Sequence, residues 1–476
     1  MAAHTPDSAS QPEDFAVVLA RFSTALGSTP LPRAVAEAVK LNIFDTLACA
    51  AAGSSAHSAS RARELAVEWG GAPQATILGY GDRVPAHHAA WVNGTMCHAR
   101  DYDDTHDAAV LHAGVSVVPA ALAAAELRGG VSGTEFMAGV AAGLETICRL
   151  GVAATVGPIE AGYIYTGLLG NFSAAIAASR VLGLDVAETV NALGITYSQS
   201  GGNHQVTRDA AHTKSMQPGF AAKAALVSVQ LTRHQVRGAQ ATFEGVDGFK
   251  RVYLRDQLDS ERLRQGLGET FELLQLSYKP YPCCRLTHTA IDVALQVAAE
   301  PGFDVARVRR IRVGLNRQSY EAVCTPVEMR KAPKTMVQAQ FSIPFTVASA
   351  LLDRGVGLAS FGEAALARAD VLALAQRVDC YVHDDIQRDW GRGVTPAQVD
   401  FEFDDGRTRS LRIDLPLGHP SRPMTVAAQD AKAADCFRAA ARPLRDDGAR
   451  ELRRLVEDLE RLDDVRALAR VLSPVA

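Results

Sequence analysis

The sequence predicts a mainly α protein, with a large, discontinuous all-α domain and a smaller α+β domain. Three observations support this. Residues 15–274 are dominated by Ala-rich segments with helical spacing. Near residue 277 the pattern changes to short stretches that alternate apolar and polar residues, which is typical of strands. Two more helical segments then follow a Pro-rich linker, so the chain is expected to return to the first domain.

Start and stop signals mark individual helices in the first part. Ser132 with Glu135 and Asp185 with Glu188 have the spacing of a capping box, in which each side chain satisfies an exposed backbone amide. They predict helices that begin near residues 133 and 186. Gly53 and Gly183 follow apolar helical segments, where a left-handed residue would end the helix. The many alanines favour close packing of these helices in a bundle.

The second part alternates strands and helices. Strands are expected at 310–316 and 378–382, and a hairpin at 399–413 turns at Asp404-Asp405-Gly406. Helices are expected at 287–299, 344–353 and 361–376, and after the linker 416–423 at 427–441 and 449–472. The predicted organisation is a frayed, flexible terminus (1–14), a helical domain (15–275), an α+β domain (276–415) and C-terminal helices that return to the helical domain (416–476).

Composition limits the class of protein. The 476 residues are 47% hydrophobic and 21% charged, as in an ordinary globular chain. Lys and Arg number 49 against 53 Asp and Glu, which gives a net charge of −4 and argues against a nucleic-acid partner. The eight cysteines form no C-x-x-C pair, which suits a reducing cytoplasm. No signal peptide is evident and no apolar run is expected to reach the roughly 20 residues that span a bilayer, so no membrane association is predicted.

Several common chemistries lack their motifs. The sequence contains no P-loop and no G-x-S-x-G nucleophile elbow. Gly266-Leu267-Gly268 lacks the third glycine and the preceding strand of a dinucleotide-binding turn.

The richest candidate segment is 98–106 together with His112. It places three carboxylates and three histidines within fifteen residues, directly after an apolar helical stretch. Such groups can transfer protons or bind a metal. A solvated acidic helix end capped by histidines is the structural alternative. A metal is the least favoured reading, because the acids do not recur at clean ligand spacing.

Three further segments contain candidate binding residues. Lys214 stands where a polar, glycine-containing stretch meets a helix, so its ammonium group can meet an anion, although an exposed loop lysine is the simpler reading. Lys279 and Arg285 flank two prolines at the join of the two domains, a favoured place for a cleft, and can clamp carboxylates. Cys283 and Cys284, between them, are expected to be buried packing residues. The fourth segment, 157–170, is an aromatic and glycine loop.

Taken in order, these segments resemble the MmgE/PrpD superfamily, which includes 2-methylcitrate dehydratase, cis-aconitate decarboxylase and iminodisuccinate epimerase. The resemblance spans nearly the whole chain. It rests on residues 44–48 with Gly53, 93–95, 98–106, 118–122, Lys214 with Gly219, 279–284 with His288, and 341–345.

The resemblance implies a cofactor-free and metal-free pocket between a helical domain and an α+β lid, usually in a homodimer. The catalytic residues it implies are Asp101, Thr105, His112, Lys214 and Lys279. Tyr320 corresponds loosely to an active-site tyrosine of the decarboxylase. Arg285 and Tyr102 are added as substrate-binding candidates from their charge and location.

One position departs from the family pattern. Many relatives have a histidine after an aromatic residue in the loop before Thr166-Gly167, where this chain has Tyr163 and then Ile164. Either Tyr163 or Tyr165 substitutes for that histidine, or the substrate and reaction differ.

The reactions of the family create or protonate a carbanion beside a carboxylate, so they need a base or acid at carbon and cations at the carboxylate. Lys214 and Lys279 are expected to supply the positive charge, His112 and Asp101 to act as acid or base, and Thr105 to orient the substrate. The leading expectation is a lyase of the 2-methylcitrate dehydratase type that acts on a small di- or tricarboxylate. An epimerase or isomerase, a cis-aconitate decarboxylase-like enzyme and a non-catalytic scaffold remain as alternatives.

Overall fold

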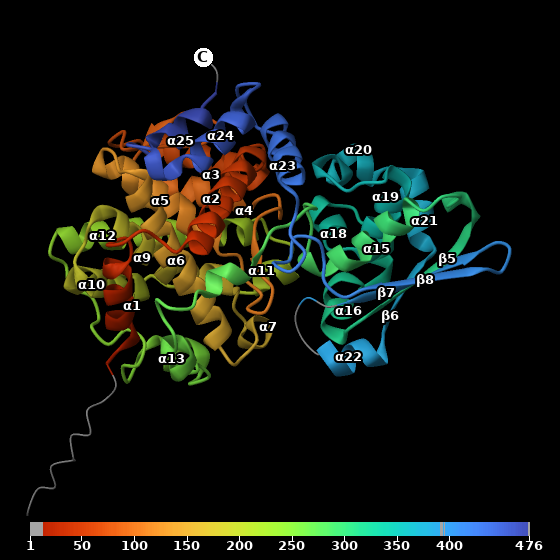
Figure 1. The fold of residues 1–476 in the computed structure, drawn as a ribbon, viewed down its shortest axis with the longest axis horizontal. Helices are drawn as coiled ribbons and strands as arrows, with labels where there is room; N and C mark the ends of the chain where they lie inside the picture. The colour runs from red at the N-terminus through yellow and green to blue at the C-terminus, as the bar shows by residue number, and fades with distance from the viewer. Residues whose placement is uncertain (1–12, 391–393, 395, 475–476) are drawn as a thin grey trace, which may run out of the picture.

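The computed structural model describes residues 13–390, 394 and 396–474. Most helices gather in one large body, and a smaller body beside it contains the main sheet (Figure 1). The longer helices of the large body are α1 (Phe15–Ala25), α2 (Arg33–Gly53), α3 (His57–Trp69), α4 (Ala86–His98), α5 (Gly114–Arg128), α6 (Gly133–Ala153), α9 (Gly170–Leu182), α10 (Val186–Tyr197) and α12 (Thr213–Arg233). Its shorter helices are α7 (Pro158–Ala161), α8 (Tyr165–Leu168), α11 (Gln205–Arg208), α13 (Phe249–Leu254) and α14 (Ser260–Arg264).

The smaller body contains a four-stranded mixed sheet in the order β6-β5-β7-β8. Strands β5 and β6 are parallel, whereas β5 with β7 and β7 with β8 are antiparallel. The strands are β5 (Val308–Leu315), β6 (Val378–Val382), β7 (Ala397–Phe403) and β8 (Thr408–Ile413). The helices are α15 (His288–Ala298), α16 (Arg317–Val323), α17 (Val327–Lys331), α18 (Met336–Gln340), α19 (Ile343–Asp353), α20 (Glu363–Leu366), α21 (Ala369–Gln376) and α22 (Asp384–Trp390).

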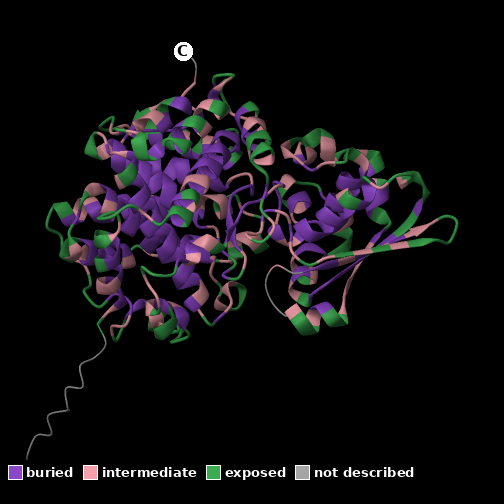
Figure 2. Ribbon diagram, viewed as in Figure 1, coloured by how far each residue is buried: buried purple, intermediate pink, exposed green. Residues whose placement is uncertain are grey.

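The chain then crosses back to the large body. The returning helices are α23 (Val426–Arg438), α24 (Gly448–Glu457) and α25 (Arg466–Val471). Helices α23 and α24 pack against α2, and α25 packs against α24 and α5 (Figure 1). The buried apolar residues form two clusters, one for each body (Figure 2). The first runs from Phe15 to Tyr278 and resumes at Met424, and the second lies between Tyr281 and Phe401. The mainly α fold and the strand assignments are therefore as predicted.

The local signals succeeded where only local chemistry mattered. Both predicted capping boxes are present, at Ser132 before α6 and at Asp185 before α10. Gly183 is left-handed, with φ of +73°, and ends α9. Gly53 is different, because it lies inside α2 with no left-handed backbone. A Cβ atom there would lie 1.8 Å from the carbonyl oxygen of Met96, so Gly53 permits α2 to pack against α4.

Two expectations about helix boundaries were wrong. The helix expected at 361–376 is divided into a 3-10 turn, α20 and α21, and the one expected at 449–472 is divided into α24, a 3-10 turn and α25. The predicted flexible terminus, 1–14, falls mostly outside the described residues, but Asp14 is fixed. Its carboxylate caps α1 through the amide of Ala16 and accepts further bonds from the amides of Phe243 and Glu244.

The expectation that no apolar run is long enough to span a membrane was also wrong. Helix α6 has 21 residues, and an 18-residue window within it has a mean hydropathy of 1.4. However, 94% of that window is buried inside the fold, where α6 packs against α9 and α5. Its apolar character is therefore accounted for by its place in the core.

Candidate active site

The site is built on the loop between α4 and α5. Helix α4 ends at His98, and the chain turns at Asp101, which has a left-handed backbone with φ of +53°. The carboxylate of Asp104 then accepts hydrogen bonds from the amides of Ala113 and Gly114 and so satisfies the start of α5. Burial and the neighbouring Asp103 carboxylate raise the pKa of Asp104 to about 6.

A short antiparallel pairing brings the junction between the two bodies to this loop. Strand β3 (Thr105–His106) pairs with β4 (Leu276–Ser277). Lys279 lies two residues after the end of β4. Its ammonium group donates to the carbonyl oxygen of Asp101 at 2.9 Å and lies 3.2 Å from the Asp101 carboxylate. The Lys279 side chain is 1% exposed. Burial lowers the pKa of Lys279, but Asp101 and Asp103 outweigh it, so the net shift is upward and the group is charged.

Lys214 reaches the same carboxylate from the first turn of α12. Helices α4 and α12 approach so closely that a Cβ atom on Gly94 would lie 2.8 Å from the Cα atom of Gly219. This approach brings the end of α4 next to the start of α12. The Lys214 ammonium group lies 3.3 Å from Asp101 Oδ1 and 3.2 Å from His98 Nε2.

Asp101 therefore lies between two ammonium groups. Burial alone would raise its pKa, but Lys214 and Lys279 hold it well below the ordinary value. The ring of Phe341, from the smaller body, lies 5.5 Å from the Lys214 ammonium group. The cluster thus sits where the two bodies meet.

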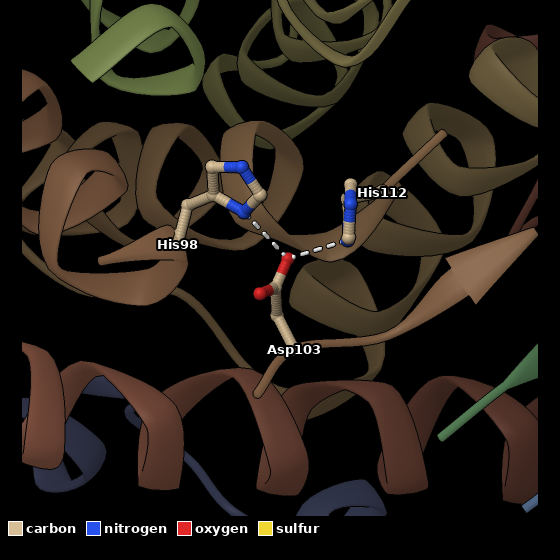
Figure 3. Close-up of side chains that lie close together, drawn as sticks. All are labelled: His98, Asp103 and His112. Carbon is tan, nitrogen blue, oxygen red and sulfur yellow. Dashed lines mark hydrogen bonds and ion pairs between the residues drawn. The ribbon is translucent and has the colours of Figure 1, made fainter. Parts of the chain in front are cut away.

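Beside this cluster, one carboxylate joins two histidines (Figure 3). Asp103 Oδ2 lies 2.9 Å from His98 Nδ1 and 2.8 Å from His112 Nδ1. Burial lowers the pKa of His98 to about 4, although Asp103 opposes the shift, so the ring is neutral at pH 7. A neutral ring that donates its Nδ1 proton to Asp103 keeps Nε2 as an acceptor, and Lys214 donates to it.

His112 is held in a similar way. Its Nδ1 faces two acceptors, the Asp103 carboxylate and the carbonyl oxygen of Asp104 at 2.7 Å, so this nitrogen carries a proton. The backbone amide of His112 donates to the hydroxyl of Thr166. The side chains of His112 and Lys214 are 18% and 20% exposed, whereas those of His98 and Asp103 are at most 1% exposed. Lys214 and His112 are therefore the two members that solvent and a substrate can reach.

Among the described residues, the side chains of His98, Asp103 and His112 are the candidate metal-binding group. One ligand atom from each of His98, Asp103 and His112 lies within 4.8 Å of the others. The nitrogen to oxygen distances of 2.8 and 2.9 Å are those of hydrogen bonds, with protons on both Nδ1 atoms, and a metal-bound histidine nitrogen must be unprotonated. As arranged, the donor set forms a hydrogen-bonded unit, and the absence of a metal stays a prediction.

Thr105 and Arg285 converge on a residue that the sequence did not single out, Asp107. The Thr105 hydroxyl donates to Asp107 Oδ1 at 2.7 Å, and the Arg285 guanidinium lies 3.3 Å from Asp107 Oδ2. Arg285 also donates to the carbonyl oxygen of Leu417, in the returning linker. These contacts connect the loop to the two chain segments that join the bodies, the one that contains Arg285 and the one that contains Leu417. A substrate contact by Thr105 or Arg285 stays a prediction.

The three predicted tyrosines are not brought together with this cluster. Tyr102 is buried, with its hydroxyl 3.2 Å from the carbonyl oxygen of Pro280 and its ring 4.4 Å from the Lys432 ammonium group. Tyr163 packs against Tyr253, with ring centroids 5.6 Å apart. Tyr320 lines a small cavity of about 110 Å³ whose lining belongs entirely to the smaller body.

The structure also assigns parts to residues within the segment 98–106 that the sequence left without individual roles. His98 and Asp103 complete the contacts of Lys214 and His112. Their only signal in the sequence was a position at a helix end in a segment rich in ionisable groups. The partners of each group could not be deduced, because they depend on the turn at Asp101.

Comparison with known proteins agrees with this architecture. Residues 17–261 match the model of the MmgE/PrpD N-terminal domain, and residues 281–461 match that of the MmgE/PrpD C-terminal domain. The chain belongs to the MmgE/PrpD family. The boundary between the two matches falls at the junction from which Lys279 extends.

Similar MmgE/PrpD proteins include cis-aconitate decarboxylases. The chain is 25% identical to cis-aconitate decarboxylase of Aspergillus terreus over 96% of this chain and 95% of that protein. It is 26% identical to human cis-aconitate decarboxylase, over 91% and 89% of the two chains. It is 27% identical to the cis-aconitate decarboxylase-like protein oryM of Aspergillus oryzae, over 84% and 86%. These relatives support a lyase, but they do not support the dehydratase that the sequence analysis favoured.

Proposed function

We propose that this MmgE/PrpD protein is a cofactor-independent lyase that decarboxylates a small unsaturated di- or tricarboxylate of the cis-aconitate type. The names of the relatives support the reaction class. The observation that carries the proposal is the Lys214 ammonium group, which is partly exposed and held between Asp101 and His98.

Decarboxylation needs less machinery than the alternatives. The bond between the carboxylate and its neighbouring carbon breaks, CO2 leaves, and the electron pair is delocalised through the adjacent double bond to a carbon beside another carboxylate, which stabilises it. One proton must then reach this allylic carbanion. Lys214 or His112 is placed to donate it, since these are the accessible members of the cluster.

The buried members hold the donors in place. Asp103 accepts from both histidines, which fixes the two rings, and Lys279 fixes Asp101. The neutral His98 ring accepts a hydrogen bond from Lys214 and so fixes one of the three ammonium protons. Such preorganisation means that little reorganisation is needed when the carbanion forms.

A dehydratase and an epimerase remain the alternatives within the lyase and isomerase classes, and a non-catalytic scaffold is the alternative of another class. A dehydratase also needs an acid for the departing hydroxyl, and an epimerase needs groups on opposite faces of the carbon. Ile164, which stands where many relatives have a histidine, bears on which substrate the pocket accepts under each of these alternatives.

The test is proton NMR in D2O of the purified protein, after exposure to EDTA, with cis-aconitate, 2-methylcitrate, citrate, iminodisuccinate and substituted malates. The proposal expects cis-aconitate or a close analogue to lose CO2 and to gain one deuterium in the product. Vinyl signals without CO2 release would establish a dehydratase instead, and deuterium exchange into an unchanged skeleton an epimerase. No reaction across the panel would favour the scaffold.

We also propose that the working form is a homodimer in the cytoplasm, as the family resemblance implies. Sedimentation equilibrium of the purified protein tests the dimer. A mass near the 50.6 kDa of one chain would contradict it.

A further inference from the structure

A buried lysine of the C-terminal segment contacts the backbone of the loop between α4 and α5, which contains the site residues. Lys432 lies on α23, which belongs to the C-terminal segment that returns to the large body. Its side chain is 3% exposed. The ammonium group lies 2.6 Å from Asp45 Oδ1, on α2, and donates to the carbonyl oxygen of Tyr102 at 2.7 Å.

The Lys432 ammonium group is compensated by an ion pair, a hydrogen bond to a carbonyl oxygen and a cation–π contact. Burial lowers the pKa of Lys432, but Asp45 outweighs it and the pKa is raised, so the group stays charged. The Tyr102 ring adds a cation–π contact at 4.4 Å. Asp45 depends on this lysine in turn, because burial raises the pKa of that carboxyl and Lys432 is the main opposing influence.

The contact with Tyr102 links this ion pair to the site. Tyr102 stands between Asp101, which pairs with both lysines, and Asp103, which joins both histidines. The backbone at Asp101 is left-handed, with φ of +53°, a conformation that is uncommon for non-glycine residues although aspartate adopts it more readily than most, so contacts that hold the neighbouring backbone help to maintain it. A charged donor on the next carbonyl oxygen is such a contact.

We propose that Lys432 is a positioning residue of the active site, which holds the Tyr102 carbonyl and thereby keeps Asp101 and Asp103 aligned with their partners. Asp45 anchors Lys432 in this role. The inference rests on the proposed function, since it assigns the effect on turnover to the same site. It means that the C-terminal segment contributes to the geometry of the reaction without contacting the substrate.

The chain offers a closely matched control in Lys40. Lys40 lies on α2 and, like Lys432, links α2 to the C-terminal segment. Its ammonium group lies 2.7 Å from the Glu460 carboxylate and donates to the carbonyl oxygen of Glu457 at 3.0 Å. Between these two parts of the fold Lys40 therefore makes one ion pair and one carbonyl contact, and within α2 it makes a second ion pair with Glu37 at 3.6 Å. Neither partner belongs to the loop 98–113.

The experiment compares Lys432→Met, the double variant Asp45→Asn/Lys432→Met, and Lys40→Met with the wild type. Each is measured for kcat, KM, urea unfolding and the ¹⁵N signals of the histidine rings. We expect Lys432→Met to lower kcat about 10²-fold, the scale of a 1 Å misplacement in an active site, while KM changes far less. The His98 and His112 signals should shift in the same variant.

The double variant separates positioning from stability. It removes the buried carboxylate that would otherwise lose its partner, so it should unfold at higher urea than Lys432→Met. It should still have the low kcat and the shifted histidine signals, because the Tyr102 carbonyl has no charged donor. If the single variant does not fold, the double variant carries the test alone. Lys40→Met should keep both kcat and the histidine signals.

Two results would overturn the inference. One is a normal kcat with unchanged histidine signals in the double variant. The other is a kcat that follows stability alone, so that Lys40→Met and Lys432→Met lose activity in proportion to their unfolding midpoints. The histidine signals need no substrate, so they test the positioning role even if the proposed reaction is wrong.

Discussion

The ammonium group of Lys279 and the carboxylate of Asp101 form a buried ion pair with a separation of 3.2 Å, and Lys279 also donates to the backbone carbonyl oxygen of Asp101. The two residues are far apart in the chain and meet because β3 pairs with β4. A second lysine, Lys214, contacts the same carboxylate from α12. These contacts are the basis of the predictions below for activity, stability and histidine protonation.

The first prediction concerns Lys214. Lys214→Ala should lower kcat/KM by about 10²- to 10³-fold, the usual loss when one preorganised donor is removed. Folding should be preserved, since the Lys214 side chain is 20% exposed and Asp101 keeps Lys279. Steady-state kinetics and thermal unfolding measure both. Lys223→Ala is the control, because Lys223 lies on the same helix as Lys214, α12, but its ammonium group lies over the rings of Trp69 and Trp91, away from Asp101. Unchanged turnover in Lys214→Ala would remove this lysine from the mechanism.

The second prediction concerns Asp101. Asp101→Asn should lower the free energy of unfolding at pH 7 by about 3 kcal/mol, because it leaves the buried Lys279 without its counter-ion. The pKa of Asp101 in the folded protein lies below its value of about 3.9 in an unfolded chain. Its stabilising effect is therefore complete above about pH 4 and is lost as the pH falls further. The difference in urea unfolding between wild type and variant should narrow progressively as the pH falls below about 4, and a pH-independent difference would contradict this assignment.

The third prediction concerns His98. In ¹⁵N-histidine NMR the ring should be neutral at pH 7, with its proton on Nδ1, and should titrate at about 4. An unfolded histidine takes up its proton near 6.5, so acidification from 6.5 to 4 should favour unfolding. Because Lys214 contributes to the lowered pKa, Lys214→Met should raise the midpoint of His98. A protonated His98 at pH 7 would show that the contact with Lys214 is different in solution.

The fourth prediction concerns metals. Dialysis against EDTA should leave turnover and the His98 and His112 signals unchanged, because both Nδ1 atoms already donate to Asp103. Activity measured before and after dialysis, with and without added Zn²⁺ or Mg²⁺, provides the check. A loss that a divalent cation restores would mean that the three side chains bind a metal in the active protein.

The fifth prediction compares two glycines. Gly53→Ala should destabilise the protein by about 3 kcal/mol or more, because the new Cβ atom would collide with the carbonyl oxygen of Met96. Gly183→Ala has no neighbour within 4 Å and should cost only the strain of a left-handed alanine, about 1 kcal/mol. Urea unfolding of the two variants tests this order, and equal losses would refute the packing role of Gly53.

Local chemistry in the sequence determined much of the fold. The capping boxes at Ser132 and Asp185 and the left-handed Gly183 work within one helical turn, so the residues themselves specify the structure. The hairpin of β7 and β8 was equally readable from its alternation and its turn. Gly53 was misread because its neighbour, Met96, is distant in the sequence, and only packing between helices explains the glycine.

The sequence also determined which residue types the site has, since Asp101, His112, Lys214 and Lys279 all lie in segments that stood out. Only the tertiary structure decided their partners. Ion pairs and hydrogen bonds depend on separations of a few ångströms, and these are set by the β3–β4 pairing and the α4–α12 contact. For the same reason, the contact between Lys432 and Tyr102, which are 330 positions apart, has no trace in the sequence, although in the folded protein Lys432 lies against the loop that contains Tyr102.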